Sequence, residues 1–558
     1  MFQTRWYLRQ VLALSLCLLA LPAVAQTFKV QCPDRTGMHP NGDTPDAAHP
    51  GLIRCQQISG GDGFATMADG TQTYLFAFGP LSGLKDIYNG LPGTQTQHIF
   101  NSVGPTGVGT PSNLVGMPDG QFDFNGAIGL TPNPAVSEDP ACAAASPPSY
   151  CATGLDGHVD PRPIMDVGVM NGSEPAPLMA IDEDDEFFLT LTNVGQIMRP
   201  DLFEQHTVHF HGYPNASAYY DGVPDASVAI NIGGSFTYYY LAPDAGTYFW
   251  HCHITPPEHL QMGMVGQLFV RPRQNRLTGN LQAALATLET PPANPTSPTG
   301  PEYERLRKRC GADILCATPI PASNAAINDG SRKYAYNDGD GTTAYDVEYP
   351  IQMHGFDPNF HFVGMTFNPE SFVDLKDKYF LLNGRSYPDT VGGYTCVPGD
   401  TLPACAGKGP GDVVAGPMQT QATDGTLHSS QPLPSVINIP AGGKALLRIS
   451  DLNVTEFHTL ASLGIPMRVI AVNARLLRDQ DGQNMAYNTN SITLGGGESI
   501  DVILDATGYA AGQKFYLYTP QLDHLSNDAE NFGGMTTEVN VCTSFDPLTR
   551  VWTGCPST

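Results

Sequence analysis

"HTVHFHG", residues 206–212, and "GTYFWHCHITPPEHLQMGM", residues 246–264, are the two most informative stretches of this chain. Together they hold six of its fifteen histidines, with one cysteine and two methionines. Both contain aromatic or β-branched residues and are bounded by turn residues, which is typical of short β-strands. Because successive side chains of a strand point to opposite faces, parity divides the donor residues into two groups.

The first group combines sulfur with imidazole. His206 and Cys252 belong to one side of the strands, and the loop that follows adds His259 and Met264. Two imidazoles, a thiolate and a weak axial thioether are the ligands of a blue, type 1 copper. Met262 is an alternative axial ligand, but we prefer Met264 because the strand-like run "VGQLFV" resumes directly after it.

The second group contains only imidazoles, namely His209, His211, His251 and His253. A set of this kind suits copper that binds oxygen species. Cys252 lies between His251 and His253, so its flanking peptide bonds connect the two groups. An electron can pass along this connection, and we therefore predict Cys252, His251 and His253 as the catalytic residues.

Short strand-like runs recur along the chain and predict β-sandwiches. They begin at "TYLFAFG", residues 73–79, and the preceding residues 26–65 have an irregular pattern. Later runs such as "INIPAGGKALLRISDLNVTEFHTLASLG" and "ITLGGGESIDVIL" repeat the order of the first block, which indicates a duplicated domain. Between the blocks, "LQAALATLETPPANPTSPTG" reads as a helix followed by a Pro-rich linker.

The N-terminus and the cysteines indicate export. Arg5 and Arg9 precede the apolar run "VLALSLCLLAL", and Ala23-Val24-Ala25 forms a small-residue cleavage site. Ten further cysteines are close neighbours in sequence, which predicts five local disulfides. These pairs are Cys32/Cys55, Cys142/Cys151, Cys310/Cys316, Cys396/Cys405 and Cys542/Cys555. Cys252 is left without a partner, as a metal ligand would be.

"HTVHFHG", "YYDGVPDASVAINIGGSFTYYY", "GTYFWHCHI" and "EHLQMGM" resemble the multicopper oxidase family of the cupredoxin superfamily. The resemblance is strong over residues 165–273 and looser over 341–545. It implies an all-β fold of tandem cupredoxin-like Greek-key β-sandwiches with long irregular insertions. It also implies copper ions as cofactors, with type 1 copper in the sulfur-containing group and type 2/type 3 copper in the imidazole group.

The sequence differs from the usual pattern of the family in two places. The loop from Cys252 to His259 is two residues longer than usual, as it is also lengthened in the related copper nitrite reductases. Family oxidases hold a trinuclear cluster with histidines from two domains, but "HTLASLG" in the repeat has Ala461 and Leu463 instead. His458 and Met535 match His206 and Met264 of the first block, and without a thiolate we interpret them as structural. The remaining candidates in the second block are His354, His361 and His524.

These patterns divide the chain into segments. We expect a signal peptide at 1–25, followed by a disulfide-tied segment at 26–65 and a copper-bearing cupredoxin domain at 66–273. A Pro-rich linker at 274–340 would lead to a second cupredoxin domain at 341–545, in which most metal ligands are lost. Residues 546–558 would form a C-terminal tail. The formal charge of −26 disfavours nucleic acid and anionic membranes as partners. Apart from the signal, no run is long enough to cross a bilayer.

The sequence favours a periplasmic or secreted oxidoreductase of the multicopper oxidase type. A metal ion or a phenol would donate electrons at the blue copper, and dioxygen would be reduced at the imidazole group. A homotrimer or a second copper-bearing subunit would complete that group. A copper nitrite reductase-like trimer and a non-enzymatic blue-copper electron carrier are the alternatives.

Overall fold

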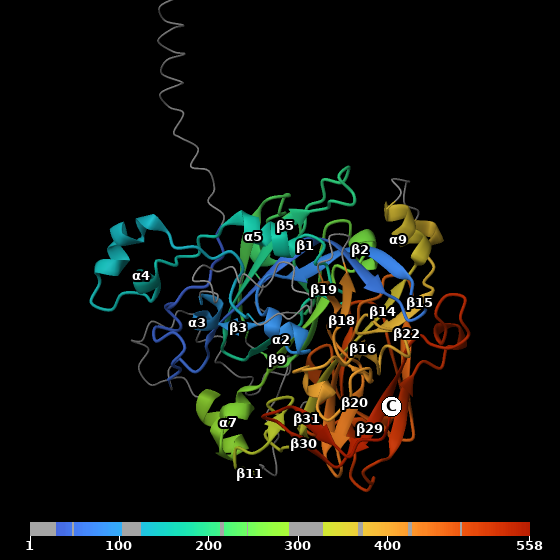
Figure 1. Ribbon diagram of the computed structural model, residues 1–558. Helices are drawn as coiled ribbons and strands as arrows, with labels where there is room; N and C mark the ends of the chain where they lie inside the picture. The colour runs from blue at the N-terminus through green and yellow to red at the C-terminus, as the bar shows by residue number, and fades with distance from the viewer. Residues whose placement is uncertain are drawn as a thin grey trace, which may run out of the picture.

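The computed structural model describes residues 29–46, 49–102, 124–212, 217–242, 244–289, 327–365, 372–421, 427–479 and 482–557. Strands predominate and the helices are short, so the all-β prediction is confirmed. The strands form two β-sandwiches, and Figure 1 shows the blue and green strands of the first above the orange and red strands of the second. The expected signal peptide and the pair Cys310/Cys316 lie outside the described residues.

The first sandwich consists of two sheets. One has the strand order β2-β1-β5-β7, with β3 also paired to β1. Its strands are β1 (Ile53–Thr66), β2 (Gln72–Pro80), β3 (Gln95–Thr96), β5 (Glu186–Gly195) and β7 (Ser235–Leu241). The other has the order β4-β9-β8-β6 and contains β4 (Met179–Asp182), β6 (His209–Phe210), β8 (Gly246–His251) and β9 (Val265–Arg271).

The second sandwich follows the same plan. One sheet has the order β15-β14-β21-β27-β23-β24, with β25 paired to β23, and the other has the order β20-β29-β28-β22-β26. The strands of the former are β14 (Val347–Phe356), β15 (Tyr379–Leu382), β21 (Lys444–Asp451), β23 (Met467–Val472), β24 (Arg475–Leu476), β25 (Tyr487–Thr489) and β27 (Ser499–Asp505). Those of the latter are β20 (Ile437–Pro440), β22 (His458–Leu463), β26 (Ser491–Leu494), β28 (Lys514–Tyr518) and β29 (Thr536–Cys542).

Small ribbons and helices fill the connections. The ribbons pair β10 (Gly279–Asn280) with β11 (Ile327–Asn328), β12 (Lys333–Tyr334) with β13 (Ala344–Tyr345), β16 (Gly393–Thr395) with β17 (Val413–Ala415), β18 (Met418–Gln421) with β19 (Leu427–Gln431), and β30 (Ser544–Asp546) with β31 (Val551–Thr553). The α-helices are α2 (Leu84–Tyr88), α3 (Gln97–Phe100), α4 (Tyr150–Thr153), α5 (Pro161–Gly168), α6 (Pro256–Gln261), α7 (Leu281–Glu289) and α9 (Pro358–Met365). Single 3₁₀ turns are η1 (Pro134–Glu138), η2 (Pro140–Ala143), η3 (Ala218–Tyr220), η4 (Arg273–Arg276), η5 (Phe372–Asp374), η6 (Pro403–Cys405) and η7 (Leu522–His524). Within the described residues, every helix falls short of the length and apolar character that a bilayer crossing requires.

Strand β1 corrects the expectation that residues 26–65 form an irregular lead-in. It runs from Ile53 to Thr66 and pairs in parallel with β5. The glycines in "SGGDG", residues 59–63, allow other groups to approach the strand closely. A Cβ at Gly63, for example, would lie 2.3 Å from the carbonyl oxygen of Gly172.

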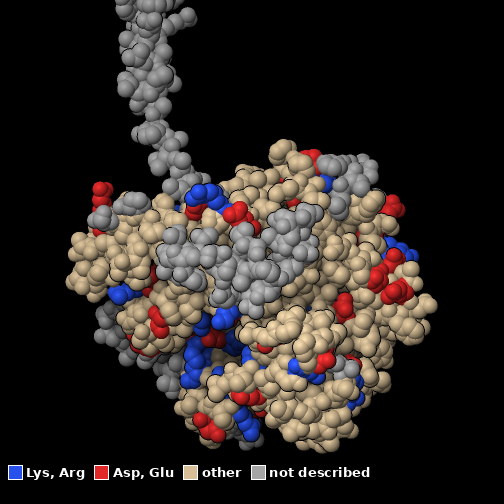
Figure 2. All heavy atoms as spheres, viewed as in Figure 1, with Lys and Arg blue, Asp and Glu red and all other residues tan. Residues whose placement is uncertain are grey.

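Four predicted disulfides are confirmed within the described part of the chain, namely Cys32–Cys55, Cys142–Cys151, Cys396–Cys405 and Cys542–Cys555. Cys252 is unpaired and buried, as predicted. Figure 2 shows Asp and Glu side chains scattered over the visible face rather than gathered in one patch.

Strand β8 is buried on both of its faces, and this arrangement decides where each donor group lies. Tyr248 and Trp250 enter the core of the first sandwich, and so does Cys252 just beyond the strand. Thr247 points the other way and donates a 2.6 Å hydrogen bond to Asp501 of the second sandwich. The thiol therefore lies in the core, while the alternate side chains of β8 face the second sandwich.

The contact between the sandwiches is held by buried charges. Arg448, which is fully buried, donates to Glu348 at 2.7 Å, and Arg271 of the first sandwich donates to the same carboxylate at 3.0 Å. Burial alone would raise the pKa of Glu348, but the two arginines outweigh it and lower the pKa to about 2. Gln267 adds a 2.8 Å hydrogen bond to Ser450. These contacts hold the imidazole side of β8 against the second sandwich.

Candidate metal centre

The sulfur-containing group forms a buried cluster. His206, Cys252 and His259 offer ligand atoms that all lie within 4.8 Å of one another. Nδ1 of His259 is 3.2 Å from Sγ of Cys252. Met264 is tied to the same residues by the backbone, since the Cys252 amide donates to the Met264 carbonyl at 3.1 Å and the Met264 amide to the His259 carbonyl at 2.8 Å. The lengthened loop that the sequence shows contains helix α6, which carries His259.

Gly60 in β1 makes room for this cluster. A Cβ at Gly60 would lie 2.7 Å from Cδ2 of His206 and 3.3 Å from Cε of Met264. The imidazole and the thioether therefore approach the same backbone position, which favours Met264 over Met262 as the axial ligand. Sequence reasoning missed Gly60, and its signal was a glycine inside a strand, where a close approach is common.

The electrostatics of the cluster favour a thiolate beside imidazoles. Burial alone would raise the pKa of the Cys252 thiol, but His259 and His206 outweigh it and bring the pKa well below its usual range. The amide of Thr207 donates to Sγ at 3.4 Å. Burial lowers the pKa of His206, which favours the neutral ring that metal binding requires.

The cluster fits a copper ion. His206 is fully buried, yet neither of its ring nitrogens has a hydrogen-bond partner among the described residues. Buried polar atoms without partners are rare because each carries the cost of lost hydration. A soft metal bound by a thiolate, two imidazoles and a thioether would take one of these two nitrogens as a ligand, and copper is the metal that this donor set prefers.

The imidazole group lies on the opposite side of β8. His209, His211 and His251 offer ligand atoms within 4.8 Å of one another, and β6 pairs with β8 so that His209 faces His251. Nδ1 of His209 donates to the carbonyl of Asp221 at 2.6 Å, and Nδ1 of His251 donates to the carbonyl of Cys252 at 2.6 Å. Nδ1 of each ring is thus engaged, and Nε2 of His251 lies 3.0 Å from Nε2 of His211, so these two nitrogens converge where a metal would bind.

Two residues complete the surroundings of the imidazole group. The ring of His253 lies 4.9 Å from that of His209, measured between centroids, so it flanks the group without joining the closest three. Gly497 of the second sandwich touches His211, since a Cβ there would lie 2.6 Å from Nδ1. Burial, followed by the charge of His209, lowers the pKa of His211 to about 4, while a hydrogen bond with the Gly497 backbone acts in the opposite direction.

The second sandwich repeats the backbone frame of the first but not its ligands. The amide of Thr519 donates to the carbonyl of Met535 at 3.0 Å, just as Cys252 does to Met264. Thr519 therefore stands where the thiol would be. Ala461 pairs with Tyr518 as His209 pairs with His251, so the described part of the second sandwich has no imidazole at either of these positions.

Four other histidines in the second half of the chain contact carboxylates or a backbone carbonyl. His458 lies 3.4 Å from Asp451, and His524 lies 3.3 Å from Glu456. His354 lies 2.9 Å from Glu174 of the first sandwich. His361 donates to the carbonyl of Tyr74. Within the described residues, none of these four rings is part of the imidazole group.

Three comparisons relate this site to known proteins. A family model described as multicopper oxidase matches residues 157–275. A laccase from Aspergillus fumigatus is 28% identical over 166 residues, which are 27% of this chain and 27% of the relative. A copper-containing nitrite reductase from Rhizobium meliloti is 34% identical over 114 residues, which are 20% of this chain and 27% of the relative. The crystal structure of a blue copper oxidase from Nitrosomonas europaea has a TM-score of 0.39 and 18% identity, over 66% of this chain and 77% of that chain.

The similarity to the curated relatives covers only part of each protein. This chain spans about a quarter of the length of these two relatives. The segment matched by the family model, residues 157–275, contains every residue of both donor groups. Over residues 157–275 the chain is therefore similar to the multicopper oxidase family.

Proposed function

We propose that this protein is a copper-dependent oxidoreductase of the multicopper oxidase type, exported to the periplasm or secreted. One observation carries the proposal: a thiolate group and an imidazole group lie on opposite sides of one strand and meet at Cys252. Copper, when bound, supplies one-electron redox chemistry at the first group and dioxygen chemistry at the second. The disulfides agree with an oxidising compartment outside the cytoplasm.

The ligand roles follow from this geometry. His206, Cys252, His259 and Met264 would hold type 1 copper, and His209, His211, His251 and His253 would hold type 2/type 3 copper. The peptide bonds that flank Cys252 join the two sites covalently. The hydrogen bond from Nδ1 of His251 to the Cys252 carbonyl, 2.6 Å long, adds a shorter connection between them. Trp250 and the surrounding core exclude water from the thiolate.

The overall reaction needs four electrons. Four one-electron oxidations of a metal ion or a phenol would supply them, and four protons would convert one dioxygen into two water molecules. An L-ascorbate oxidase is among the relatives, and its name supports a small organic donor. We propose the donor class from the relatives alone.

A neighbouring chain would complete the imidazole group. The group lies on β6, which is the edge strand of its sheet, and His209 is 17% exposed. Within this chain the second sandwich reaches the group through the backbone of Gly497 rather than through imidazoles. A homotrimer or a second copper-bearing subunit would therefore provide the missing ligands.

Copper counting combined with spectroscopy tests the proposal. We expect thiolate-to-copper absorption equivalent to one copper per chain, additional copper seen by electron paramagnetic resonance, and oxygen consumption with a phenol or Fe(II). Cys252→Ser should remove the absorption and the oxygen consumption. A protein with no such absorption when fully loaded with copper would contradict the assignment of both sites.

Nitrite reduction is the second candidate. The three closest imidazoles, His209, His211 and His251, match the number that a single type 2 copper needs, and a copper-containing nitrite reductase is among the relatives. The same preparation should be assayed for nitrite consumption under anaerobic conditions. Turnover of nitrite without oxygen consumption would favour this function, and a blue protein that turns over neither would be an electron carrier.

A further inference from the structure

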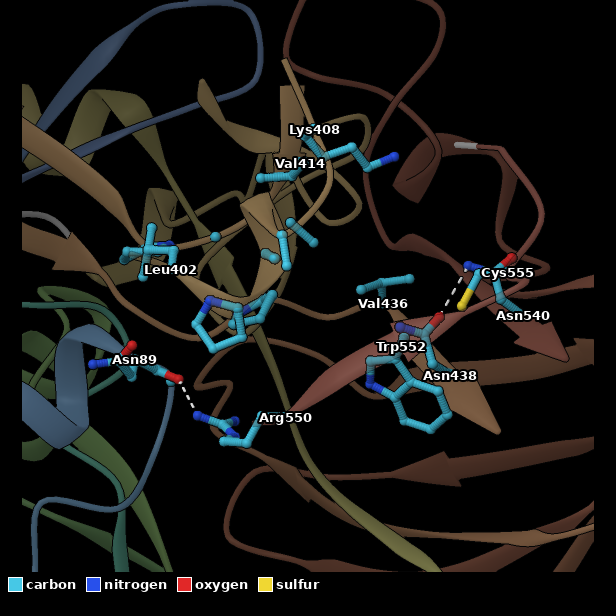
Figure 3. Close-up of a pocket in the computed structure, with 18 of the residues that line it drawn as sticks. Asn89, Leu402, Lys408, Val414, Val436, Asn438, Asn540, Arg550, Trp552 and Cys555 are labelled. Carbon is cyan, nitrogen blue, oxygen red and sulfur yellow. Dashed lines mark hydrogen bonds between the residues drawn. The ribbon is translucent and has the colours of Figure 1, made fainter. Parts of the chain in front are cut away.

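A cavity of about 610 Å³ lies away from the copper ligands, between helix α2 and the second sandwich. Its walls come from distant parts of the chain, namely segments within residues 88–90, 402–408, 414–417, 432–438 and 550–557, together with Tyr349 and Asn540. Figure 3 shows Arg550 and Trp552 on one side and Lys408 and Val414 on the other. A volume of this size is typical of a site for a small organic molecule, for which about 300–1,000 Å³ is usual.

The charge of the cavity differs from that of the whole chain. The formal net charge is −26, yet none of the described residues that line the cavity is Asp or Glu. Arg550 and Lys408 both line it. Neither forms an ion pair with a carboxylate in the described part of the chain, and Asp86 acts on Arg550 only from outside the lining. The cavity is therefore cationic within an acidic protein and complements an anion.

The position of Arg550 suits a carboxylate ligand. Its Nη1 donates a 2.8 Å hydrogen bond to the carbonyl of Asn89, which orients the guanidinium at the cavity wall. Burial lowers the pKa of Arg550, because the charge has lost part of its hydration. A carboxylate can replace the lost hydration by accepting two parallel hydrogen bonds, because its two oxygens match the spacing of the N–H groups of the planar guanidinium.

The same wall suits an aromatic ring. Trp552 stacks on Phe545, with ring centroids 4.5 Å apart and planes at 27°, so one face of the indole is covered and its position is set. The side chain is half-buried and lines the cavity beside Arg550. Tyr349, also in the lining, is oriented by a 2.8 Å hydrogen bond to the Asn438 carbonyl. Aromatic walls beside a cation select a planar anion over a small inorganic one.

Covalent links keep the walls in place. The disulfide Cys396–Cys405 closes the segment that leads to Lys408, and Cys542–Cys555 ties the β30–β31 hairpin to β29. Asn438 and Asn540 bond to each other across neighbouring strands at 3.3 Å, as Figure 3 shows. A preformed cavity loses little conformational entropy when a ligand enters, which favours binding.

We propose that this cavity binds a small aromatic carboxylate, with the ring against Trp552 and the carboxylate on Arg550. Lys408 on the opposite side adds a second positive charge. The proposal does not depend on copper chemistry, because the cavity contains none of the copper ligands. Its test is therefore distinct from the test of the proposed function.

Tryptophan fluorescence reports on this cavity directly. The chain has three tryptophans: Trp552 lines the cavity, Trp250 is fully buried in the first sandwich, and Trp6 lies in the expected signal peptide. The copper-loaded full chain would be titrated with benzoate, and with benzyl alcohol and acetate as matched controls that lack the charge or the ring. We expect a saturable change with benzoate and at least about ten-fold weaker binding of either control.

Variants assign the binding to the cavity. Trp552→Phe should remove the fluorescence change while calorimetry still detects benzoate binding. Arg550→Gln should weaken binding about 10- to 100-fold, as expected for the loss of a charge-assisted hydrogen bond. Lys408→Gln serves as a second variant in case Arg550→Gln does not fold. Arg162→Gln is the control, because Arg162 is 84% exposed on helix α5 and does not line the cavity.

Three results would overturn the proposal. The first is equal binding of benzoate and benzyl alcohol, which would show that the cations do not contribute. The second is unchanged benzoate affinity in both folded variants, Arg550→Gln and Lys408→Gln. The third is tighter binding of a neutral oligosaccharide or a proline-rich peptide than of benzoate at this site.

Discussion

Gly60→Ala tests the packing that holds the thiolate group together. The added Cβ would lie 2.7 Å from Cδ2 of His206, about 0.7 Å inside the distance at which ordinary contact begins, and 3.3 Å from Cε of Met264. His206 is fully buried, so its ring cannot move without displacing its neighbours. Overpacking of this kind costs about 1–3 kcal/mol. We expect that loss in the free energy of unfolding, together with displacement of the imidazole and the thioether.

Two measurements separate the effects of the substitution. Urea unfolding of copper-free protein reports the packing cost, and titration with copper, followed by thiolate-to-copper absorption, reports ligand geometry. We expect copper binding to weaken on the order of ten-fold, which corresponds to about 1.4 kcal/mol. Gly37→Ala is the matched control, because nothing lies within 4 Å of a Cβ at that position. If Gly60→Ala behaves like Gly37→Ala in both measurements, His206 is not packed against β1 and the reasoning is wrong.

Three further predictions address the other parts of the structure. Cys252→Ser should abolish the thiolate-to-copper absorption and lower the copper content by one per chain, with an unchanged far-ultraviolet circular dichroism spectrum. Gly497→Ala should release copper from the imidazole group and preserve the absorption of the thiolate group, because its Cβ would lie 2.6 Å from Nδ1 of His211 and its φ is +88°; equal copper loss from both groups would contradict this. The folded pKa of Glu348, about 2, lies below its ordinary value of 4.5, so its contribution is present above about pH 4.5 and is lost as the pH falls towards 2. That contribution is on the order of 3 kcal/mol, and Glu348→Gln should flatten the acid side of the stability profile measured by urea unfolding, whereas an unchanged profile would exclude this carboxylate as its source.

Several features could be predicted from sequence because they depend on local geometry. Successive side chains of a strand point to opposite faces, and this alternation does not depend on tertiary contacts. Cys252 and His251 therefore had to face opposite sides. Short sequence separations predicted four disulfides that the described residues contain. The substitutions in "HTLASLG" likewise revealed that the second sandwich lacks imidazoles, because β22 and β28 repeat the pairing of β6 and β8.

Other features depend on which distant segments meet. Nothing near Gly60 indicates chemistry, and its role arises because β1 packs against His206 from a different sheet. The contact of Gly497 with His211 joins the two sandwiches across almost three hundred residues of chain. The cavity around Arg550 needs helix α2 and the C-terminal hairpin side by side.

The sequence by itself determined the donor types, their division between two faces of a strand and the β-rich class of the fold. These follow from residue chemistry and from the two-residue period of a strand, both of which are local. Only the tertiary structure decided which face became core and which met the second sandwich, how Gly60 and Gly497 admit the imidazoles, and where a cationic cavity forms. Close packing brings together segments that are far apart in the chain, and no local periodicity records which of them will be neighbours.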